Sequence, residues 1–283
     1  MSSIAVQHTF RPVIEKLDIE QQTLALYHWP VPESKAKATV LLVHGLGEYA
    51  GRYNHVAFAL HQAGYAVIGY DHTGHGLSTG VRGDIEQPQQ LVQDLQAVIQ
   101  HMRAENTPLV LLGHSMGGLV VARAMAQHPE LADAVVLSSP ALGAFTSFID
   151  NIMLAFLPSW FPHVRVDNKL PLNWLARDAQ VVREYRHDKL VHRKISAGLA
   201  AWIISQGKLA LAQADQWSTP GLLMYAGQDR LVDPHATEVF VKAVPSGVLQ
   251  SHCFNVMYHE IFNDPEKNQV LTKLTEWLDK RYA

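Results

Sequence analysis

Short apolar runs alternate with stretches of helical periodicity along most of this chain of 283 residues. Apolar runs of about four to eight residues, bounded by polar residues and glycines, are typical of strands buried on both faces of a parallel sheet. Such runs predict strands at Thr39–Val43, Ala66–Tyr70, Leu109–Leu112, Ala134–Leu137, Gly221–Tyr225 and Val248–Phe254. Two earlier runs, Val13–Leu17 and Leu24–Trp29, predict an antiparallel hairpin.

Helices are predicted between these strands, where apolar side chains recur at spacings of three and four residues. This periodicity covers Tyr53–Leu60, Leu91–Met102, His235–Ala243 and Asn268–Lys280, and a further helix-like segment follows Ser115. Strands that alternate with helices favour an α/β fold with a mostly parallel central sheet and helices on both faces.

The alternation stops between about Ala141 and Gln206. This stretch contains three tryptophans, several prolines and many apolar residues, but no clear buried strand. We therefore expect a helical cap at residues 141–206, inserted between two parts of one core at residues 1–140 and 207–283. Ligands of open α/β sheets bind at the carboxyl ends of the strands, and the cap is expected to lie there.

Composition narrows the class of protein. With 48% hydrophobic and 17% charged residues, the chain can bury a large core. A net charge of −3 gives no indication of nucleic-acid binding. The single cysteine, Cys253, cannot form an intramolecular disulfide and is expected as a small apolar residue in a late strand. The N-terminus lacks the features of a signal peptide, and no run reaches the roughly 18 apolar residues of a membrane span, so a cytoplasmic location is expected.

The segment Gly113-His-Ser115-Met-Gly117 stands between a predicted strand and a predicted helix. This is the strand–turn–helix context of a nucleophile elbow, in which a sharp turn raises the serine hydroxyl above the sheet. The flanking glycines leave room for the neighbouring chain, where a Cβ would clash. Ser115 is therefore the candidate nucleophile of an esterase-type site.

A serine hydroxyl needs a base within hydrogen-bond reach, and the base needs an acid that orients it. In this type of fold the order along the chain is serine, acid, histidine. Asp229 directly follows the predicted strand Gly221–Tyr225 and is the candidate acid. Asp233 is the rival, but the proline after it and the helix-like segment beyond predict a helix N-cap.

His259 follows the last predicted strand and is the candidate base, chosen among 16 histidines. His252 lies inside that strand, and the tight turn is expected to aim the side chain of His114 away from Ser115. His72 and His75 lie too early for the order of the triad. Their spacing offers no further ligands for a metal ion, and no metal or organic cofactor is expected.

Acyl transfer creates an oxyanion, which backbone N–H groups stabilise. One donor is expected to be the amide of Met116, immediately after the nucleophile. The second is expected from the glycine-rich loop His44-Gly-Leu46-Gly-Glu48, with the Leu46 N–H as the candidate.

At these residues the chain resembles the monoacylglycerol lipase and lysophospholipase branch of the α/β-hydrolases. The matching segments are His44-Gly-Leu-Gly-Glu-Tyr-Ala-Gly-Arg-Tyr53, Tyr70-Asp-His-Thr-Gly-His-Gly-Leu-Ser78, Gly113-His-Ser-Met-Gly-Gly118, Gly227-Gln-Asp-Arg-Leu-Val-Asp233 and Tyr258-His-Glu260. The resemblance implies a triad of Ser115, Asp229 and His259, with oxyanion donors at Leu46 and Met116.

The resemblance also implies a cap domain between the strand after the nucleophile and the strand before the acid. The segment Tyr185–His192 matches this cap. The chain departs from the family at Tyr49, where a histidine is usual, at Thr73, where an arginine is usual, and at Asn255–Met257, which replaces a glycine-rich turn. No departure removes a member of the triad, but each bears on substrate specificity.

Within the expected cap, apolar residues form one wide helix face. They are Phe145, Phe148, Ile149, Ile152, Met153, Phe156, Leu157 and Trp160. Most are expected to pack on the core. Phe145, Ile149, Ile152 and Phe156 are candidate substrate-binding residues for an acyl chain, and part of the face is a candidate for transient contact with a lipid surface.

The sequence thus predicts a serine hydrolase that cleaves carboxylic esters, with monoacylglycerols as the first substrate class. A lysophospholipase, a broad carboxylesterase and an acyltransferase would use the same residues and remain alternatives. A non-catalytic small-molecule receptor on a hydrolase scaffold is an alternative from another class. Dehalogenase and epoxide-hydrolase chemistry is disfavoured, because those relatives usually carry aspartate at the position of Ser115. The oligomeric state is left open.

Overall fold

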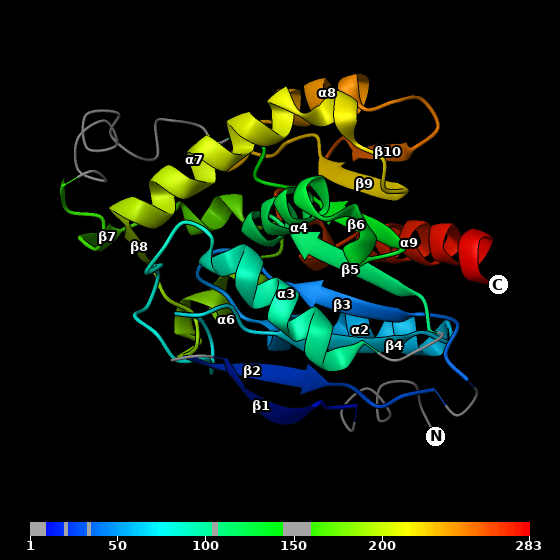
Figure 1. The fold of residues 1–283 in the computed structure, drawn as a ribbon, viewed down its shortest axis with the longest axis horizontal. Coiled ribbons are helices and arrows are strands. Elements are labelled where there is room, and N and C mark those ends of the chain that lie inside the picture. The colour runs from blue at the N-terminus through cyan, green and yellow to red at the C-terminus, as the bar shows by residue number, and fades with distance from the viewer. Residues whose placement is uncertain (1–9, 20–21, 33–34, 104–106, 144–159) are drawn as a thin grey trace.

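The computed structural model describes residues 10–19, 22–32, 35–103, 107–143 and 160–283. Its centre is an eight-stranded sheet in the order β1-β2-β4-β3-β5-β6-β9-β10 (Figure 1). The strands are β1 (Val13–Ile19), β2 (Gln22–His28), β3 (Thr39–Val43), β4 (Ala66–Tyr70), β5 (Leu109–His114), β6 (Ala134–Ser138), β9 (Gly221–Ala226) and β10 (Leu249–Phe254). Strand β2 runs antiparallel to β1 and β4, and the other neighbouring pairs are parallel. The predicted α/β-hydrolase fold is confirmed.

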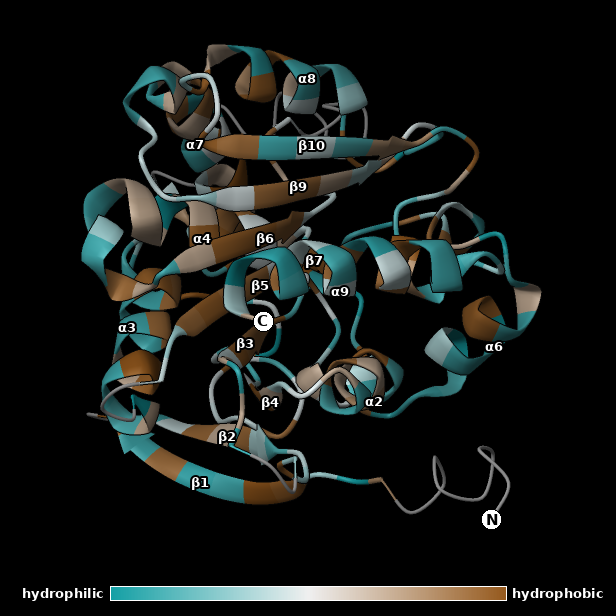
Figure 2. Ribbon diagram, turned by 90° about the vertical axis from the view of Figure 1, so that its right-hand side faces the viewer, coloured by the Kyte–Doolittle hydropathy of each residue, from teal (hydrophilic) through white to brown (hydrophobic). Residues whose placement is uncertain are grey.

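Helices cover both faces of this sheet, as the turned view in Figure 2 shows. Helices α3, α4, α7 and α8 contribute side chains to the core on one face, and α2 and α9 contribute to the core on the other. Their bounds are α2 (Asn54–Gln62), α3 (Gln90–Met102), α4 (Met116–Gln127), α7 (Ala197–Ala212), α8 (Pro234–Ala243) and α9 (Lys267–Tyr282). No helix of the described ranges is long and apolar enough to cross a membrane.

The central strands are buried on both faces, which explains why they are apolar throughout. Because successive side chains of a strand point to opposite faces, Leu41 and Leu111 join one core while Leu42 and Leu112 join the other. All four side chains are at most 1% exposed. Strict alternation of apolar and polar residues is therefore absent, and short uninterrupted apolar runs identify these strands.

The segment between β6 and β9 contains helices α6 (Ala179–His187) and α7. Its part before residue 207 is called the cap segment below. The sequence showed no clear strand here, but β7 (Arg165–Asp167) and β8 (Lys194–Ser196) form a small antiparallel sheet. Three residues are too few to show a hydrophobic pattern, so the sequence did not predict these two short strands. The cap boundaries at 141 and 206 stay a prediction, and α7 continues to Ala212.

This segment lies against the loops at the carboxyl ends of the strands. The His192 N–H donates to the Gly47 carbonyl after β3, at 3.0 Å, and the Ser196 N–H donates to the Gly83 carbonyl in the segment after β4, at 2.8 Å. The Glu260 N–H after β10 donates to the Leu175 carbonyl, at 2.8 Å. Backbone hydrogen bonds thus hold the segment over the edge where a ligand site is expected.

We predict that Leu111→Ala lowers the free energy of unfolding by about 2–5 kcal/mol, because it leaves a cavity in β5, a strand whose residues are all buried. Urea denaturation of both proteins measures the difference. Val239→Ala, at a side chain that is 41% exposed on α8, is the control and is expected to change this free energy by no more than about 0.5 kcal/mol. A Leu111→Ala protein as stable as this control would contradict the prediction.

Candidate active site

Ser115 lies at the sharp turn between β5 and α4, with φ 52° and ψ −118°. This conformation is costly for a residue with a side chain, and such strain is concentrated at functional sites. A Cβ added at Gly113 would lie 2.5 Å from the carbonyl oxygen of Gly117, and one added at Gly117 would overlap the carbonyl oxygen of Val43. The two glycines therefore allow the turn and bring β3 against the start of α4.

One hydrogen-bonded chain joins the three residues that the sequence predicted as a triad. Ser115 Oγ lies 2.8 Å from His259 Nε2, and His259 Nδ1 lies 2.7 Å from Asp229 Oδ2. The second carboxylate oxygen of Asp229 accepts the N–H groups of Leu231 at 2.8 Å and Val232 at 3.0 Å. These bonds fix the carboxylate after β9, and the carboxylate in turn fixes the imidazole after β10.

The charge of Asp229 decides the proton affinity of His259. Burial by itself lowers the pKa of this imidazole, but the carboxylate beside it outweighs burial, and the pKa lies above the ordinary value. An imidazole that hydrogen-bonds a serine hydroxyl on one side and a carboxylate on the other can take the serine proton and remain stable as a cation.

The rival residues have other places in the structure. Asp233 caps α8, as predicted, and accepts the N–H of His235 at 2.9 Å. His252 is an exposed residue of β10. His114 donates no proton to Ser115; its Nδ1 lies 3.1 Å from Ser138 Oγ, and its ring packs beside His259 with centroids 4.8 Å apart.

The predicted oxyanion donors lie next to Ser115. A Cβ added at Gly45 would lie 3.3 Å from Ser115 Cβ, so the loop after β3 passes directly over the serine. Leu46 and Met116 both line the cavity that opens here. Met116 is the first residue of α4, where helix N–H groups have no partner within the helix. Among the described residues, the Leu46 N–H also has no acceptor. Two free amides therefore border the serine.

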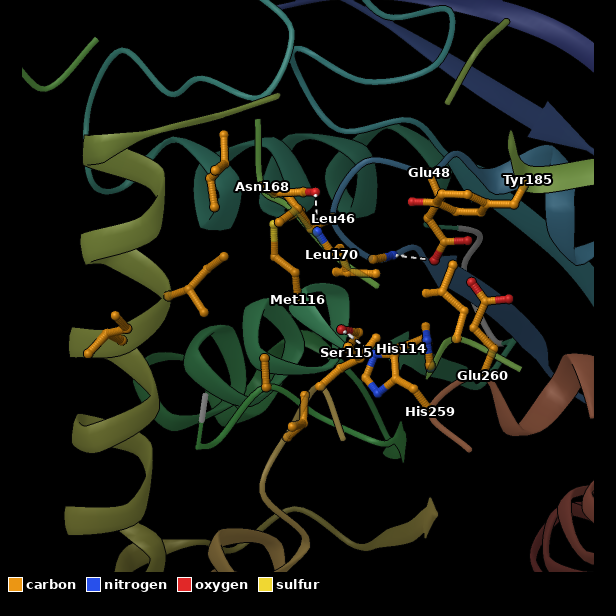
Figure 3. Close-up of a pocket in the computed structure, with 18 residues that line it drawn as sticks. Leu46, Glu48, His114, Ser115, Met116, Asn168, Leu170, Tyr185, His259 and Glu260 are labelled. Carbon is orange, nitrogen blue, oxygen red and sulfur yellow. Dashed lines mark hydrogen bonds between the residues drawn. The ribbon is translucent and has the colours of Figure 1, made fainter. Parts of the chain in front are cut away.

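The cavity is mostly apolar and has a volume of about 120 Å³ (Figure 3). Its apolar wall comes from loops, from β8 and from helices α4 and α7. The apolar residues are Leu46, Met116, Ala141, Leu170, Leu175, Ile195, Ile203, Ile204, Leu231 and Val232. Besides Ser115 and His259, its polar side chains are those of Glu48, His114, Asn168, Tyr185 and Glu260. Such a lining suits a ligand with an apolar part and a small polar part.

The candidate substrate-binding residues Phe145, Ile149, Ile152 and Phe156 lie outside the described residues. Asn168, Ile195 and Ile203 line the cavity without having been singled out in the sequence. No signal in the sequence marks them, because they come from different elements and meet only when the cap segment packs on the core. Within the described ranges, no group of three or more histidine, cysteine or acidic side chains is arranged to hold a metal ion.

A buried ion network adjoins the polar end of the cavity. The Arg52 guanidinium donates to both carboxylate oxygens of Glu260, each at 2.8 Å, and it also bonds to Glu48. The ring of Tyr185 on α6 faces this cation, with 4.8 Å between the guanidinium carbon and the ring centroid. Arg52 thus joins the loop after β3, the loop that carries His259 and the cap segment.

The two carboxyls of this network respond differently to burial. Burial raises the pKa of both carboxyls. At Glu48 the effect of burial exceeds the opposing effect of the Arg52 charge, so the pKa of Glu48 lies above the ordinary value. At Glu260 the two-pronged contact with Arg52 outweighs burial and lowers the pKa to about 2. The network therefore depends on the arginine cation.

We predict that Arg52→Ala lowers the free energy of unfolding by about 3–5 kcal/mol, because it leaves two buried carboxyls without their cation. Urea denaturation measures this loss, with Arg183→Ala on the exposed side of α6 as the control. A loss below about 1 kcal/mol, equal to that of the control, would show that the network does not stabilise the fold.

Comparison with known proteins identifies the family to which this chain belongs. Residues 34–266 match the family described as serine aminopeptidase, S33 (Hydrolase_4). A monoacylglycerol lipase of Mycolicibacterium smegmatis is 33% identical over 87% of this chain and 90% of its own length. An uncharacterized abhydrolase domain-containing protein of Dictyostelium discoideum is also 33% identical, over 94% of this chain, but the chain spans only 28% of that protein.

A solved structure gives the same result for the fold. The crystal structure of the monoacylglycerol lipase of Paleococcus ferrophilus superposes with a TM-score of 0.82 at 31% identity, over 90% of this chain and 98% of that one. The family match over residues 34–266 includes Ser115, Asp229 and His259. The chain therefore belongs to the Hydrolase_4 (serine aminopeptidase S33) family of α/β-hydrolases and is similar to its monoacylglycerol lipases.

Proposed function

We propose that this protein hydrolyses carboxylic esters of single-chain lipids, with monoacylglycerols as the principal substrate class, through an acyl-enzyme intermediate at Ser115. The observation that carries the proposal is the hydrogen-bonded chain from Asp229 through His259 to Ser115, which opens into a mostly apolar cavity. The similarity to monoacylglycerol lipases supports the choice of substrate class.

In the first half of the reaction, Ser115 Oγ attacks the ester carbonyl while His259 Nε2 takes its proton. The Asp229 carboxylate stabilises the imidazolium that forms. The carbonyl oxygen becomes an oxyanion, which accepts hydrogen bonds from the Leu46 and Met116 amides. When the tetrahedral intermediate collapses, the bond to the alcohol breaks, and His259 delivers the proton to the leaving alkoxide.

In the second half, water enters the place of the alcohol. His259 takes a proton from this water, and the resulting hydroxide attacks the acyl carbonyl with the same two amides as donors. Collapse breaks the ester bond to Ser115, the imidazolium returns its proton to Oγ, and the fatty acid leaves. All groups required are side chains or amides of this chain, so the reaction needs neither metal nor cofactor.

The shape of the site supports a substrate with one acyl chain. The apolar wall, which α7 supplies with Ile203 and Ile204, suits a hydrocarbon chain. The polar end, with Glu48 and Tyr185, suits hydroxyls of a small alcohol, because these side chains accept or donate hydrogen bonds.

The cap segment supports contact with lipid, which we propose as the route by which such esters enter. After the candidate residues of the cap in the sequence, Trp160, Phe161 and Val164 are 78%, 61% and 44% exposed. Exposed apolar side chains that lie together mark interaction surfaces, and tryptophan favours the boundary between lipid and water. We also propose that the protein is cytoplasmic and that its cap spans residues 141–206.

We predict that the wild type hydrolyses monoacylglycerols of graded acyl length and that Ser115→Ala lowers kcat by at least about 10³-fold. Released fatty acid measures the rate. Ser205→Ala, on α7 with its hydroxyl bonded to the Trp202 carbonyl, is the matched control and is expected to retain activity. Turnover of only a lysophospholipid would favour a lysophospholipase, and turnover of only a short p-nitrophenyl ester would favour a carboxylesterase. Tight binding without turnover would favour a receptor.

The pH profile tests the proton affinity of His259. Because only the neutral imidazole takes the serine proton, kcat/KM is expected to rise with pH, with an inflection above the ordinary histidine pKa of 6.5. Asp229→Asn removes the charge that raises this pKa, so the rate is expected to fall by about 10²–10⁴-fold and the inflection to move to lower pH. An inflection that stays in place would contradict the role of Asp229.

A further inference from the structure

One side chain of the loop after β3 is bonded to the cap segment. The Tyr49 hydroxyl donates to Asp188 Oδ2 at 2.8 Å, across 139 positions of the chain. Burial and the Asp188 carboxylate raise the pKa of Tyr49 above its ordinary value, so this hydroxyl keeps its proton and remains a donor. A hydrogen bond to a charged carboxylate is stronger than one between neutral groups. It is therefore a strong link between the core and the cap segment.

The ring of Tyr49 is held in place on the core side of this link. Tyr49 directly precedes the short helix Ala50–Tyr53, and its ring lies against the backbone of Gly51. A Cβ added at Gly51 would lie 2.6 Å from Tyr49 Cε2, which is closer than real contacts allow. Glycine here thus leaves room for the ring in the position from which its hydroxyl reaches Asp188.

On the cap side, Asp188 stands where local helix energetics disfavour it. It is the C-cap of α6, and a carboxylate at a helix C-terminus interacts unfavourably with the helix dipole. Two hydrogen bonds offset this cost, because Oδ2 accepts the Tyr49 hydroxyl and Oδ1 accepts the Leu190 N–H at 2.8 Å. A residue that breaks a local rule and is held by a tertiary contact indicates a role beyond the helix itself.

The end of α6 that this link holds also carries Tyr185, three positions before Asp188. Residues at this spacing lie on one face of a helix. The Tyr185 hydroxyl lies over Gly47, 3.4 Å from a Cβ added there, and Figure 3 shows it beside Glu48 and directed into the cavity. The side chain is only 5% exposed, and within the described part of the chain its hydroxyl has no hydrogen-bond partner. It is therefore available to a hydroxyl of the substrate.

We propose that Tyr49 is a positioning residue for substrate specificity: its bond to Asp188 holds the Tyr185 hydroxyl at the polar end of the cavity, where it binds a hydroxyl of the leaving alcohol. The proposal rests on the ester hydrolysis at Ser115 proposed above. An alcohol with further hydroxyls can form a hydrogen bond with Tyr185, whereas an alkyl alcohol leaves this buried hydroxyl unpaired. Sites discriminate strongly against substrates that leave a buried polar group unpaired.

Two esters of one fatty acid test this selection, the 1-monoacylglycerol and the n-propyl ester, whose alcohols differ only in hydroxyls. Tyr49→Phe removes the hydroxyl that bonds to Asp188. We expect it to lower the ratio of kcat/KM for the monoacylglycerol to that for the propyl ester by at least about threefold, because one hydrogen bond contributes up to about tenfold. The change is expected in KM, since the contact is made with the bound ester as well as with the transition state. A merely structural defect would lower both values and leave their ratio unchanged.

The matched control is Tyr65→Phe. The Tyr65 hydroxyl also donates to an aspartate, Asp279 on α9, at 2.8 Å, but neither residue lines the cavity. Its removal is expected to leave the ratio within about twofold of that of the wild type. A fall of less than about threefold in Tyr49→Phe, or an equal fall in the control, would overturn the proposal.

A double-mutant cycle tests whether Tyr49 acts through Tyr185. Tyr185→Phe keeps the ring that faces Arg52 and removes only the hydroxyl, so it is expected to lower the ratio by at least as much as Tyr49→Phe. If Tyr49 acts through this hydroxyl, the double variant has the ratio of Tyr185→Phe alone. Two factors that multiply in the double variant would show independent effects and would overturn the proposal.

A crystal structure of the wild type with a phosphonate analogue of a monoacylglycerol on Ser115 tests the proposal without any substitution, should the variants fail to fold. We expect a glycerol hydroxyl within hydrogen-bond distance of Tyr185 Oη, with the Tyr49 hydroxyl still on Asp188. A glycerol group bound elsewhere would overturn the proposal. A wild type that hydrolyses both esters, with a ratio that Tyr49→Phe does not change, would refute this proposal alone. A wild type that hydrolyses no carboxylic ester would refute the proposed function, and this proposal with it.

Discussion

The close approach of two backbone segments, the end of β3 and the start of α4, is the constraint on which the rest of the site depends. The parallel register of β3 with β5 pairs Val43 with Gly113, so the residues that follow each strand meet at one edge of the sheet. Gly117 makes the contact possible, because a Cβ there would overlap the Val43 carbonyl. The same approach brings Leu46 and Met116 together with Ser115 in the lining of one cavity.

Once these segments meet, the polar groups around them must be satisfied, and each contact fixes a reactive group in one orientation. Asp229 receives two backbone N–H groups and holds His259. Buried hydrogen bonds of this kind are costly to leave unmade, so they also define a single arrangement of the loops.

The ion network around Arg52 links this arrangement to the cap segment. Glu48 belongs to the loop after β3, Glu260 follows His259, and Tyr185 belongs to α6. Burying these charges away from water costs free energy. The contacts within the network offset this cost only when all of the partners are in place. One buried cation therefore contacts the loop after β3, the residue after His259 and the cap segment.

Much of this protein is determined locally and could be predicted from its sequence. The strands of the parallel sheet are apolar because both of their faces are buried. Helix α8 begins after Asp233 because the carboxylate of this residue accepts the free N–H of His235 in the first turn of the helix. The motif around Ser115 and the order of serine, acid and histidine made the site residues candidates, since each stands next to a predicted strand. The short strands β7 and β8 were missed, because three residues carry no pattern.

Contacts between distant segments were decided only by the tertiary structure. The hydroxyl of Tyr49 is bonded to Asp188, which is 139 positions away, and the pKa of Glu260 depends on Arg52, which is 208 positions away. The wall of the cavity combines Asn168, Ile195 and Ile203 with core residues, and none of these is marked by its neighbours in the chain. The sequence alone determined the elements and the reactive groups, because these follow from local periodicity and residue chemistry. Their orientation, proton affinity and shared cavity arise from packing between residues far apart in the chain, which no local pattern records.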